Sequence, residues 1–244
     1  MIVPIFLLLL NTLQVTRKGD IMSIADNLIR LRREIPPGVR IIAVSKTMPV
    51  SAILEAYQAG QRAFGENRAQ DMADKKKQLP GDMEWHMIGH LQTNKVKLII
   101  PFVHLVHSVD SLKLLSVIDA EARRAGRRVD CLLQMRIARE ETKFGMTGED
   151  VAQMMDSAEF SSLGNVRITG LMGMATFTTD MEQVRQEFLQ LASHFTTVKY
   201  GWFQHSPAFR EISMGMSGDY REAIAAGSTM VRIGSLIFGE RVYN

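Results

Sequence analysis

The chain has 244 residues, of which 46% are hydrophobic and 23% are charged, and its net charge is +3. This composition is that of a globular protein, and the length suits one large domain such as an α/β barrel. The small net charge is too weak to indicate a nucleic-acid-binding protein. The single cysteine, Cys131, excludes an intrachain disulfide and predicts a reducing, cytoplasmic location.

The first 21 residues have an unusual composition for the start of a folded domain. Their apolar run is about ten residues long, whereas a helix that crosses a bilayer needs about 20. No basic region precedes the run, and no A-x-A cleavage site follows it. At Met22 a different pattern begins, with Ser23 as the N-cap of an amphipathic helix. We therefore predict that residues 1–21 are a translated leader and that the native domain spans 22–244; a membrane-targeting segment is the alternative.

From Arg40 onward, short apolar runs alternate with amphipathic helical segments. The predicted strands are 41–45, 62–65, 85–88, 104–107, 129–136, 167–171, 211–214 and 231–234. The predicted helices are one from Ser23 and those at 50–60, 68–79, 91–100, 110–126, 147–158, 180–195 and 218–227. Repeated βα units form a parallel sheet, and eight units in about 200 residues favour a single closed (β/α)8 TIM barrel. Neither G-x-G-x-x-G nor a P-loop motif follows a strand, so no dinucleotide or P-loop site is predicted.

The glycine- and serine-rich segments after the last two predicted strands are candidate phosphate-binding loops. In TIM barrels the active site lies at the carboxyl ends of the strands, and the loops after strands seven and eight often bind phosphate. Here these loops are Ser213–Asp219 and Arg232–Ser235. Glycines allow backbone N–H groups to approach an anion, and serine hydroxyls add donors. We predict a phosphate site there, and two ordinary tight turns are the alternative.

Lys46 ends the first strand, which neighbours strand eight in a closed barrel. An ordinary surface lysine with its stem on apolar surface is one interpretation. A desolvated amine beside a phosphate site is instead suited to form a Schiff base with a phosphorylated aldehyde, and pyridoxal 5′-phosphate (PLP) is such an aldehyde. Other predicted strand ends carry side chains that suit a flat aromatic ring: Glu66, Asn67, His86, His90 and Met172.

Six motifs, in order, carry a resemblance to a known family: "AVSKT", "FGENRAQ", "WHMIGHLQTNK", "GLMGMAT", "SMGMSGDYREAI" and "VRIGSLIFGER". From about Met22 to Tyr243 the chain resembles the pyridoxal phosphate homeostasis protein family. Its members are single-domain PLP carriers with a barrel of the alanine racemase N-terminal-domain type. The segments "KYGWFQHSPAFREIS" and "KFG" depart from the family pattern, which leaves the lengths of two loops open.

The resemblance implies a role for each candidate cofactor residue. Lys46 forms the Schiff base, and Arg232 faces the pyridine nitrogen. The implied phosphate loops contribute Ser213, Gly215, Ser217, Gly234 and Ser235, with Gly215 shaping its loop. Asn67, His86 and Met172 line the pocket.

The same resemblance implies a carrier and not an enzyme. A charged guanidinium at Arg232 disfavours a protonated pyridine nitrogen, which weakens PLP as an electron sink. Alanine racemase adds a second domain and a tyrosine base; we identify neither in this sequence and interpret Tyr243 as a packing residue. We therefore expect a monomeric cytoplasmic protein of PLP homeostasis that binds PLP and amino acids and contacts PLP-dependent enzymes transiently. We expect neither nucleic acid nor a membrane as a partner.

Three other functions are alternatives. One is a small PLP-dependent amino-acid racemase or lyase, and another is a phosphosugar enzyme that uses Lys46 without PLP. The third is a metal protein, because His86 and His90 have i, i+4 spacing. Gly89 interrupts helical character between them and no third ligand follows at metal-site spacing, so no metal site is predicted.

Overall fold

The computed structural model describes residues 23–139 and 144–239. Eight parallel strands close into a barrel in chain order, with β8 paired to β1. The strands are β1 (Arg40–Val44), β2 (Ala63–Glu66), β3 (Glu84–Met87), β4 (Leu105–Val109), β5 (Val129–Gln134), β6 (Val166–Met172), β7 (Glu211–Met216) and β8 (Met230–Ile233). The predicted (β/α)8 barrel is confirmed. The predicted leader, residues 1–21, lies outside the described residues.

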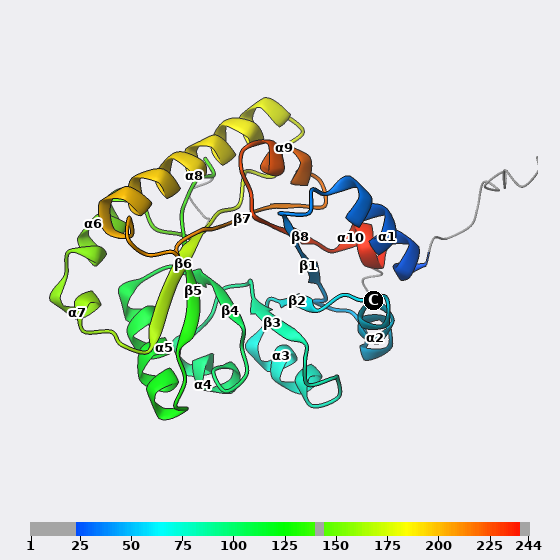
Figure 1. Cartoon of the computed structure of the whole chain (residues 1–244), viewed down its shortest axis with the longest axis horizontal. Helices are drawn as coiled ribbons and strands as arrows, with labels where there is room; N and C mark the ends of the chain where they lie inside the picture. The colour runs from blue at the N-terminus through cyan, green and yellow to red at the C-terminus, as the bar shows by residue number, and fades with distance from the viewer. Residues whose placement is uncertain (1–22, 140–143, 240–244) are drawn as a thin grey trace, which may run out of the picture.

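Helices surround the barrel on its outside (Figure 1). They are α1 (Ile24–Glu34), α2 (Val50–Gln58), α3 (Ala69–Lys76), α4 (Val96–Ile99), α5 (Leu112–Arg124), α6 (Gly148–Met155), α7 (Ala158–Ser161), α8 (Met181–Trp202), α9 (Tyr220–Ala225) and α10 (Ser235–Phe238), with a 3-10 turn, η1 (Thr93–Lys95), before α4. The first and last helices close the ring, where Asn27 Nδ2 donates to the Ile237 carbonyl at 3.1 Å. Among the described residues, none of the helices has the length and apolar character needed to cross a bilayer.

Side-chain caps fix where several helices begin. The Ser23 hydroxyl accepts from the Asp26 N–H at 3.1 Å, as the predicted N-cap requires. Thr147 and Asp150 form a reciprocal capping box at the start of α6. The Asp180 carboxylate caps α8 by accepting from two backbone N–H groups. These caps satisfy donors that would otherwise lack an intrahelical partner.

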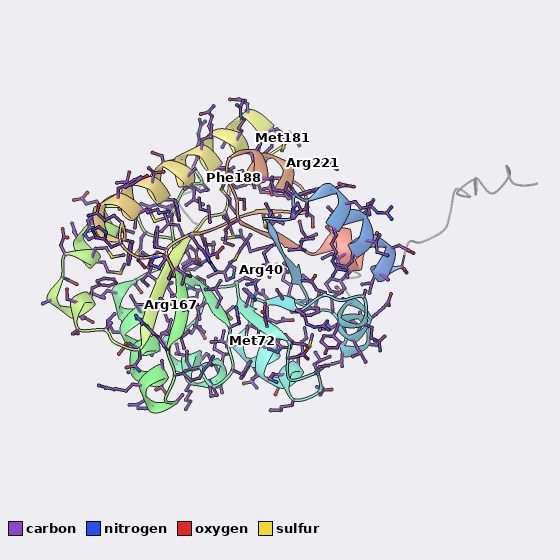
Figure 2. All side chains as sticks on the ribbon, in the orientation of Figure 1. Arg40, Met72, Arg167, Met181, Phe188 and Arg221 are labelled. Carbon is purple, nitrogen blue, oxygen red and sulfur yellow. The ribbon has the colours of Figure 1, made fainter. Side chains whose placement is uncertain are left out.

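The core has two layers. The outer layer lies between strands and helices and contains Trp85, Phe64 and Phe188, all fully buried; Figure 2 shows Phe188 on the barrel side of α8. The inner layer fills the barrel with Ile42, Ala63, Leu105, Leu132, Met172 and Met230. An eight-stranded barrel is just wide enough for side chains to fill its interior. Its floor is therefore packed, and a ligand has room only at a mouth.

Several element ends differ from those predicted. Helix α8 continues past residue 195 to Trp202. The rings of Phe195 and of the C-cap residue Phe203 each stack on buried Phe209, with centroids 4.9 and 4.6 Å away, and this packing holds the last turns against the protein. The predicted helix 91–100 is instead a 3-10 turn followed by a single α-helical turn. Strand β4 begins at Leu105, so His104 lies before the strand and is exposed.

Candidate cofactor site at the carboxyl end of the barrel

A cavity of about 660 Å³ lies at the carboxyl ends of the strands. Its lining includes Lys46 after β1, Asn67 after β2, Ser217 after β7, and Gly234 and Ser235 after β8. Arg232 reaches the cavity from within β8. The predicted amine, phosphate loops and guanidinium therefore share one cavity.

A tight turn positions Lys46 at this mouth. The Ser45 carbonyl, at the end of β1, accepts from the Met48 N–H at 3.0 Å. Between them Thr47 has φ +67°, a left-handed conformation that is unfavourable for a β-branched residue. Such strain persists only where the surroundings enforce it, and it is common at ligand-binding sites. Lys46 itself is half-buried, so part of its stem is shielded from water.

A buried ion pair holds this turn against β2. The fully buried Glu66 accepts from the Ser45 hydroxyl at 2.6 Å and from Lys75 Nζ at 2.7 Å. Lys75 Nζ also donates to the Ser45 carbonyl at 2.8 Å. Sequence analysis placed Glu66 beside a flat ring, but the residues that line the cavity do not include it. Its carboxylate instead links the Lys46 turn to α3.

The loops after β7 and β8 are joined to each other. Ser217 Oγ accepts from the Gly234 N–H at 3.2 Å. The Asp219 carboxylate accepts from the Met216 N–H and closes the first loop. Beneath it, Gly215 has φ +93°, and a Cβ there would lie 2.5 Å from the Cβ of Ala223 in α9. Only glycine satisfies both the conformation and the close approach of α9.

Arg232 is a buried, fixed cation. Its Nη1 donates to the carbonyl and the hydroxyl of Ser213, at 2.8 and 2.7 Å, and its Nη2 donates to the Gly173 carbonyl at 3.0 Å. Burial lowers the pKa of Arg232 to about 10, partly opposed by the negative charge of Asp219. The guanidinium therefore stays charged at neutral pH and presents a positive donor group to the cavity.

A chain of buried polar side chains is linked to Arg232 through Ser213. The Ser213 hydroxyl lies 2.9 Å from His107 Nδ1, and His107 Nε2 lies 2.9 Å from His86 Nδ1. All three residues are fully buried. Burial lowers the pKa of His86 and of His107 well below the ordinary value, and for His107 the charge of Arg232 acts in the same direction. Both imidazoles are therefore neutral at pH 7.

The chain is similar to known proteins over most of its length. Residues 20–242 match the family model of the alanine racemase N-terminal domain. The pyridoxal phosphate homeostasis protein of Vibrio alginolyticus is 39% identical over 214 residues, which cover 86% of this chain and 89% of the relative. The protein of the same name from Escherichia coli K12 is 35% identical over 236 residues, covering 91% of this chain and 98% of the relative.

The chain belongs to the pyridoxal phosphate homeostasis protein family.

Solved structures extend the comparison. PipY of Synechococcus elongatus PCC7942 is 37% identical in the form without PLP, with a TM-score of 0.82 over 89% of this chain and 100% of PipY. The form with PLP bound has a TM-score of 0.79 at 36% identity, with the same coverage. An alanine racemase of Clostridium difficile 630 is 14% identical with a TM-score of 0.68 over 91% of this chain and 57% of the racemase. That last likeness shows the shared barrel fold alone.

Some residues that the family resemblance singled out do not line the cavity. His86, Met172, Ser213 and Gly215 are absent from the described lining and are buried below it. Met172 belongs to the inner core layer, and His86 and Ser213 to the polar chain under Arg232. Direct contact between these residues and a cofactor stays a prediction. Their observed positions suit support of Arg232 and of the loop after β7.

Sequence analysis did not predict the aromatic side chains at the edge of the carboxyl-end cavity. Phe144 and Phe177 are strongly exposed and line the cavity together with Met174. The ring of Phe144 stacks on His90, with centroids 4.4 Å apart, and His90 Nδ1 lies 3.2 Å from Asp110 Oδ2. His107, which sequence analysis did not single out, belongs to the buried polar chain. Its position within the apolar run 103–109 is the signal that could have indicated burial.

Proposed function

We propose that this protein binds PLP in the carboxyl-end cavity, with a Schiff base to Lys46, and acts as a cytoplasmic carrier in PLP homeostasis. The observation that carries the proposal is the presence of Lys46, the joined loops at Ser217 and Gly234, and charged Arg232 around one cavity of about 660 Å³. The family membership and the PLP-bound PipY structure support the same function.

The donor set fits the phosphate end of the cofactor. Hydroxyls come from Ser217 and Ser235, and the backbone N–H group of Gly218 lies on the same loop as Ser217. Serine hydroxyls and glycine N–H groups are the donors that bind phosphate oxygens in barrel proteins. Gly215 lets α9 approach β7 closely and so fixes the loop that carries Ser217. Lys46 supplies the amine for the aldehyde end, with loss of water when the bond forms.

Arg232 argues for storage over catalysis. PLP withdraws electrons from the bonds next to an attached amine when the pyridine nitrogen of PLP is protonated. A guanidinium that stays charged at neutral pH and is fixed by Ser213 and Gly173 has no proton acceptor to offer, and its charge disfavours a second cation on the ring. The side chain would therefore hold a bound cofactor in its weakly electron-withdrawing form.

One contact favours the enzymatic alternative, a small PLP-dependent amino-acid racemase or lyase. His90 lines the cavity, and its Nδ1 lies 3.2 Å from the Asp110 carboxylate. A histidine oriented by a carboxylate is a common general base. Tyr243, the other base considered from sequence, lies outside the described residues.

A transfer assay separates these functions. PLP-loaded protein is mixed with a PLP-requiring enzyme freed of its cofactor, and recovery of that enzyme's activity is compared with recovery from an equal amount of free PLP. The carrier proposal predicts recovery from the loaded protein and no turnover of amino acids by the protein alone. Turnover of an amino acid that is lost in His90→Gln would instead establish the enzymatic alternative.

A further inference from the structure

A second group of chemistry-bearing side chains lies at the opposite, amino-terminal mouth of the barrel. Glu84, His86 and His104 each bring one potential ligand atom within 4.8 Å of the other two. The backbone causes this juxtaposition. Glu84 and His86 are two residues apart on β3 and so face the same side of the sheet, inside the barrel, while Trp85 between them packs outward. The His104 N–H donates to the Trp85 carbonyl at 2.8 Å, which places His104 beside β3.

His86 carries an unpaired polar atom. Its side chain is fully buried, and its Nδ1 is used by His107. Its Nε2 is buried and has no hydrogen-bond partner among the described residues. A buried polar group without a partner is destabilising, so each such atom in a native protein calls for an explanation. His104 and Glu84 lie next to this imidazole, and the rings of His86 and His104 are 5.2 Å apart between centroids.

We propose that Glu84, His86 and His104 bind a divalent transition-metal ion of the Zn²⁺ class. Two imidazoles with one carboxylate are a ligand set that Zn²⁺ uses. Mg²⁺ and Ca²⁺ prefer oxygen ligands, so a site with two imidazoles binds them poorly. The Nε2 atom of His86 supplies the buried ligand, and water completes the coordination from the open mouth. Sequence analysis considered only the pair His86 and His90, and it predicted no metal site because Gly89 interrupts helical character and no third ligand follows. The barrel places His90 at its other end, on the carboxyl-end cavity.

The ligands need only a small adjustment. Tetrahedral zinc with bonds of about 2.1 Å places its ligand atoms about 3.4 Å apart. The three potential ligand atoms here lie within 4.8 Å of one another, so they must move somewhat closer together. His104 is exposed and Glu84 is half-buried, so both side chains can rotate toward the fixed His86. His104 also lines an open cavity of about 510 Å³, through which an ion can enter from solvent.

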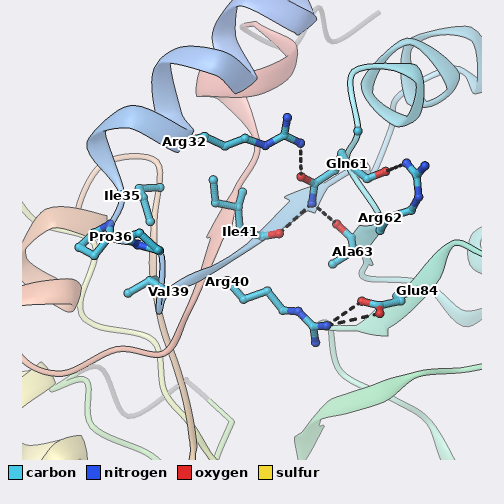
Figure 3. Close-up of a pocket in the computed structure, with 12 residues that line it drawn as sticks. Arg32, Ile35, Pro36, Val39, Arg40, Ile41, Gln61, Arg62, Ala63 and Glu84 are labelled. Atoms are coloured by element: carbon cyan, nitrogen blue, oxygen red, sulfur yellow. Dashed lines mark hydrogen bonds and ion pairs between the residues drawn. The ribbon is translucent and has the colours of Figure 1, made fainter.

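Arg40 is the main competitor for Glu84. Its guanidinium contacts both carboxylate oxygens, at 3.0 Å and 3.4 Å (Figure 3). The Arg40 side chain is 41% exposed, and ion pairs this accessible to solvent are weak. The other charges at this mouth are already paired, Arg167 with Asp130 and Arg210 with Glu211. Metal binding therefore requires Arg40 to release one oxygen of Glu84.

The site is connected to the carboxyl-end cavity. A metal on Nε2 of His86 leaves the ring proton on Nδ1, where it is donated to His107 Nε2. His107 Nδ1 then donates to the Ser213 hydroxyl, which also accepts from Arg232. Metal binding would therefore fix which atom donates and which accepts in each hydrogen bond from His86 to Ser213, next to the Arg232 guanidinium.

Calorimetric titration with Zn²⁺ tests the proposal on the full chain after dialysis against EDTA. The wild-type protein should bind one equivalent at micromolar concentration or tighter. Replacing an outer-shell partner of a metal site typically weakens binding by about 10- to 100-fold, so His104→Ala, which removes a ligand, should lose at least that much. The matched control is His205→Ala, another exposed histidine, which should bind like wild type.

Arg40→Gln provides an independent arm, because it removes the competitor and should tighten binding severalfold. The melting temperature of each variant checks that the fold is intact. Because the His104 side chain is exposed, His104→Ala should fold like the wild-type protein. The proposal is wrong if wild-type protein shows no stoichiometric binding at micromolar Zn²⁺. It is equally wrong if His104→Ala and His205→Ala bind alike. Neither result depends on whether PLP binds at Lys46.

Discussion

Gly215 allows the loop that carries Ser217 to sit close to α9, and replacing it by alanine should be costly for two separable reasons. At φ +93° an alanine is strained, which costs about 1–2 kcal/mol. Its Cβ would also lie 2.5 Å from Ala223 Cβ, and overpacking of this kind costs about 1–3 kcal/mol. The lower entropy of the unfolded alanine chain returns about 0.4–1 kcal/mol. The free energy of unfolding should therefore fall by roughly 1–5 kcal/mol.

Two glycines elsewhere in the chain separate these terms. Gly227 has φ +96° with nothing within 4 Å of an added Cβ, so its alanine variant has the strain without the clash and should lose roughly 1 kcal/mol. Gly218 has neither constraint, and its alanine variant should gain about 0.4–1 kcal/mol. Urea unfolding followed by circular dichroism, without PLP, measures all three. If Gly215→Ala is no more destabilising than Gly227→Ala, then α9 yields freely and the close packing inferred for this loop is wrong.

Three further predictions concern the phosphate loop, the leader and the thiol. Ser217→Ala removes a hydroxyl donor to a charged group, so PLP affinity measured by absorbance titration should fall roughly ten- to hundredfold. Pyridoxal, which lacks the phosphate, should bind weakly to both proteins. Equal PLP affinities of the variant and the wild type would show that the phosphate binds elsewhere. A chain that starts at Met22 should melt and bind PLP like the full chain, and a large loss of either property would show that residues 1–21 belong to the fold. Burial raises the pKa of Cys131 well above its ordinary value, so a thiol reagent at pH 7–8 should label it only after denaturation, and rapid labelling of the native protein would contradict its burial.

The sequence was sufficient for the barrel because its signal is local. Apolar runs such as Ile41–Val44 alternate with amphipathic helices, and eight such units have one common closed arrangement. Lys46, Ser217 and Gly234 could be assigned to one mouth because the carboxyl ends of parallel strands meet there. The helix cap at Ser23 follows from residue type and position alone.

Depth within the barrel could not be predicted in the same way. His86 and Met172 each lie at or near a strand end, but the tilt and stagger of barrel strands decide which layer a side chain occupies. The structure places Met172 in the apolar layer and His86 in the polar chain. The approach of His104 to Glu84 likewise depends on the pairing of β3 with the segment before β4, which no local pattern encodes.

The proposed bond to Lys46 is tested most directly by reducing the PLP-loaded protein with borohydride and sequencing the labelled peptide. The account predicts loss of the visible-edge absorbance and a phosphopyridoxyl group on Lys46. Lys46→Ala should remove the label and keep the fold, whereas Lys95→Ala, an exposed lysine on the neighbouring pocket at Asn67 and His90, should keep both. A label on any other lysine of the wild-type protein, or one that persists in Lys46→Ala, would contradict the account.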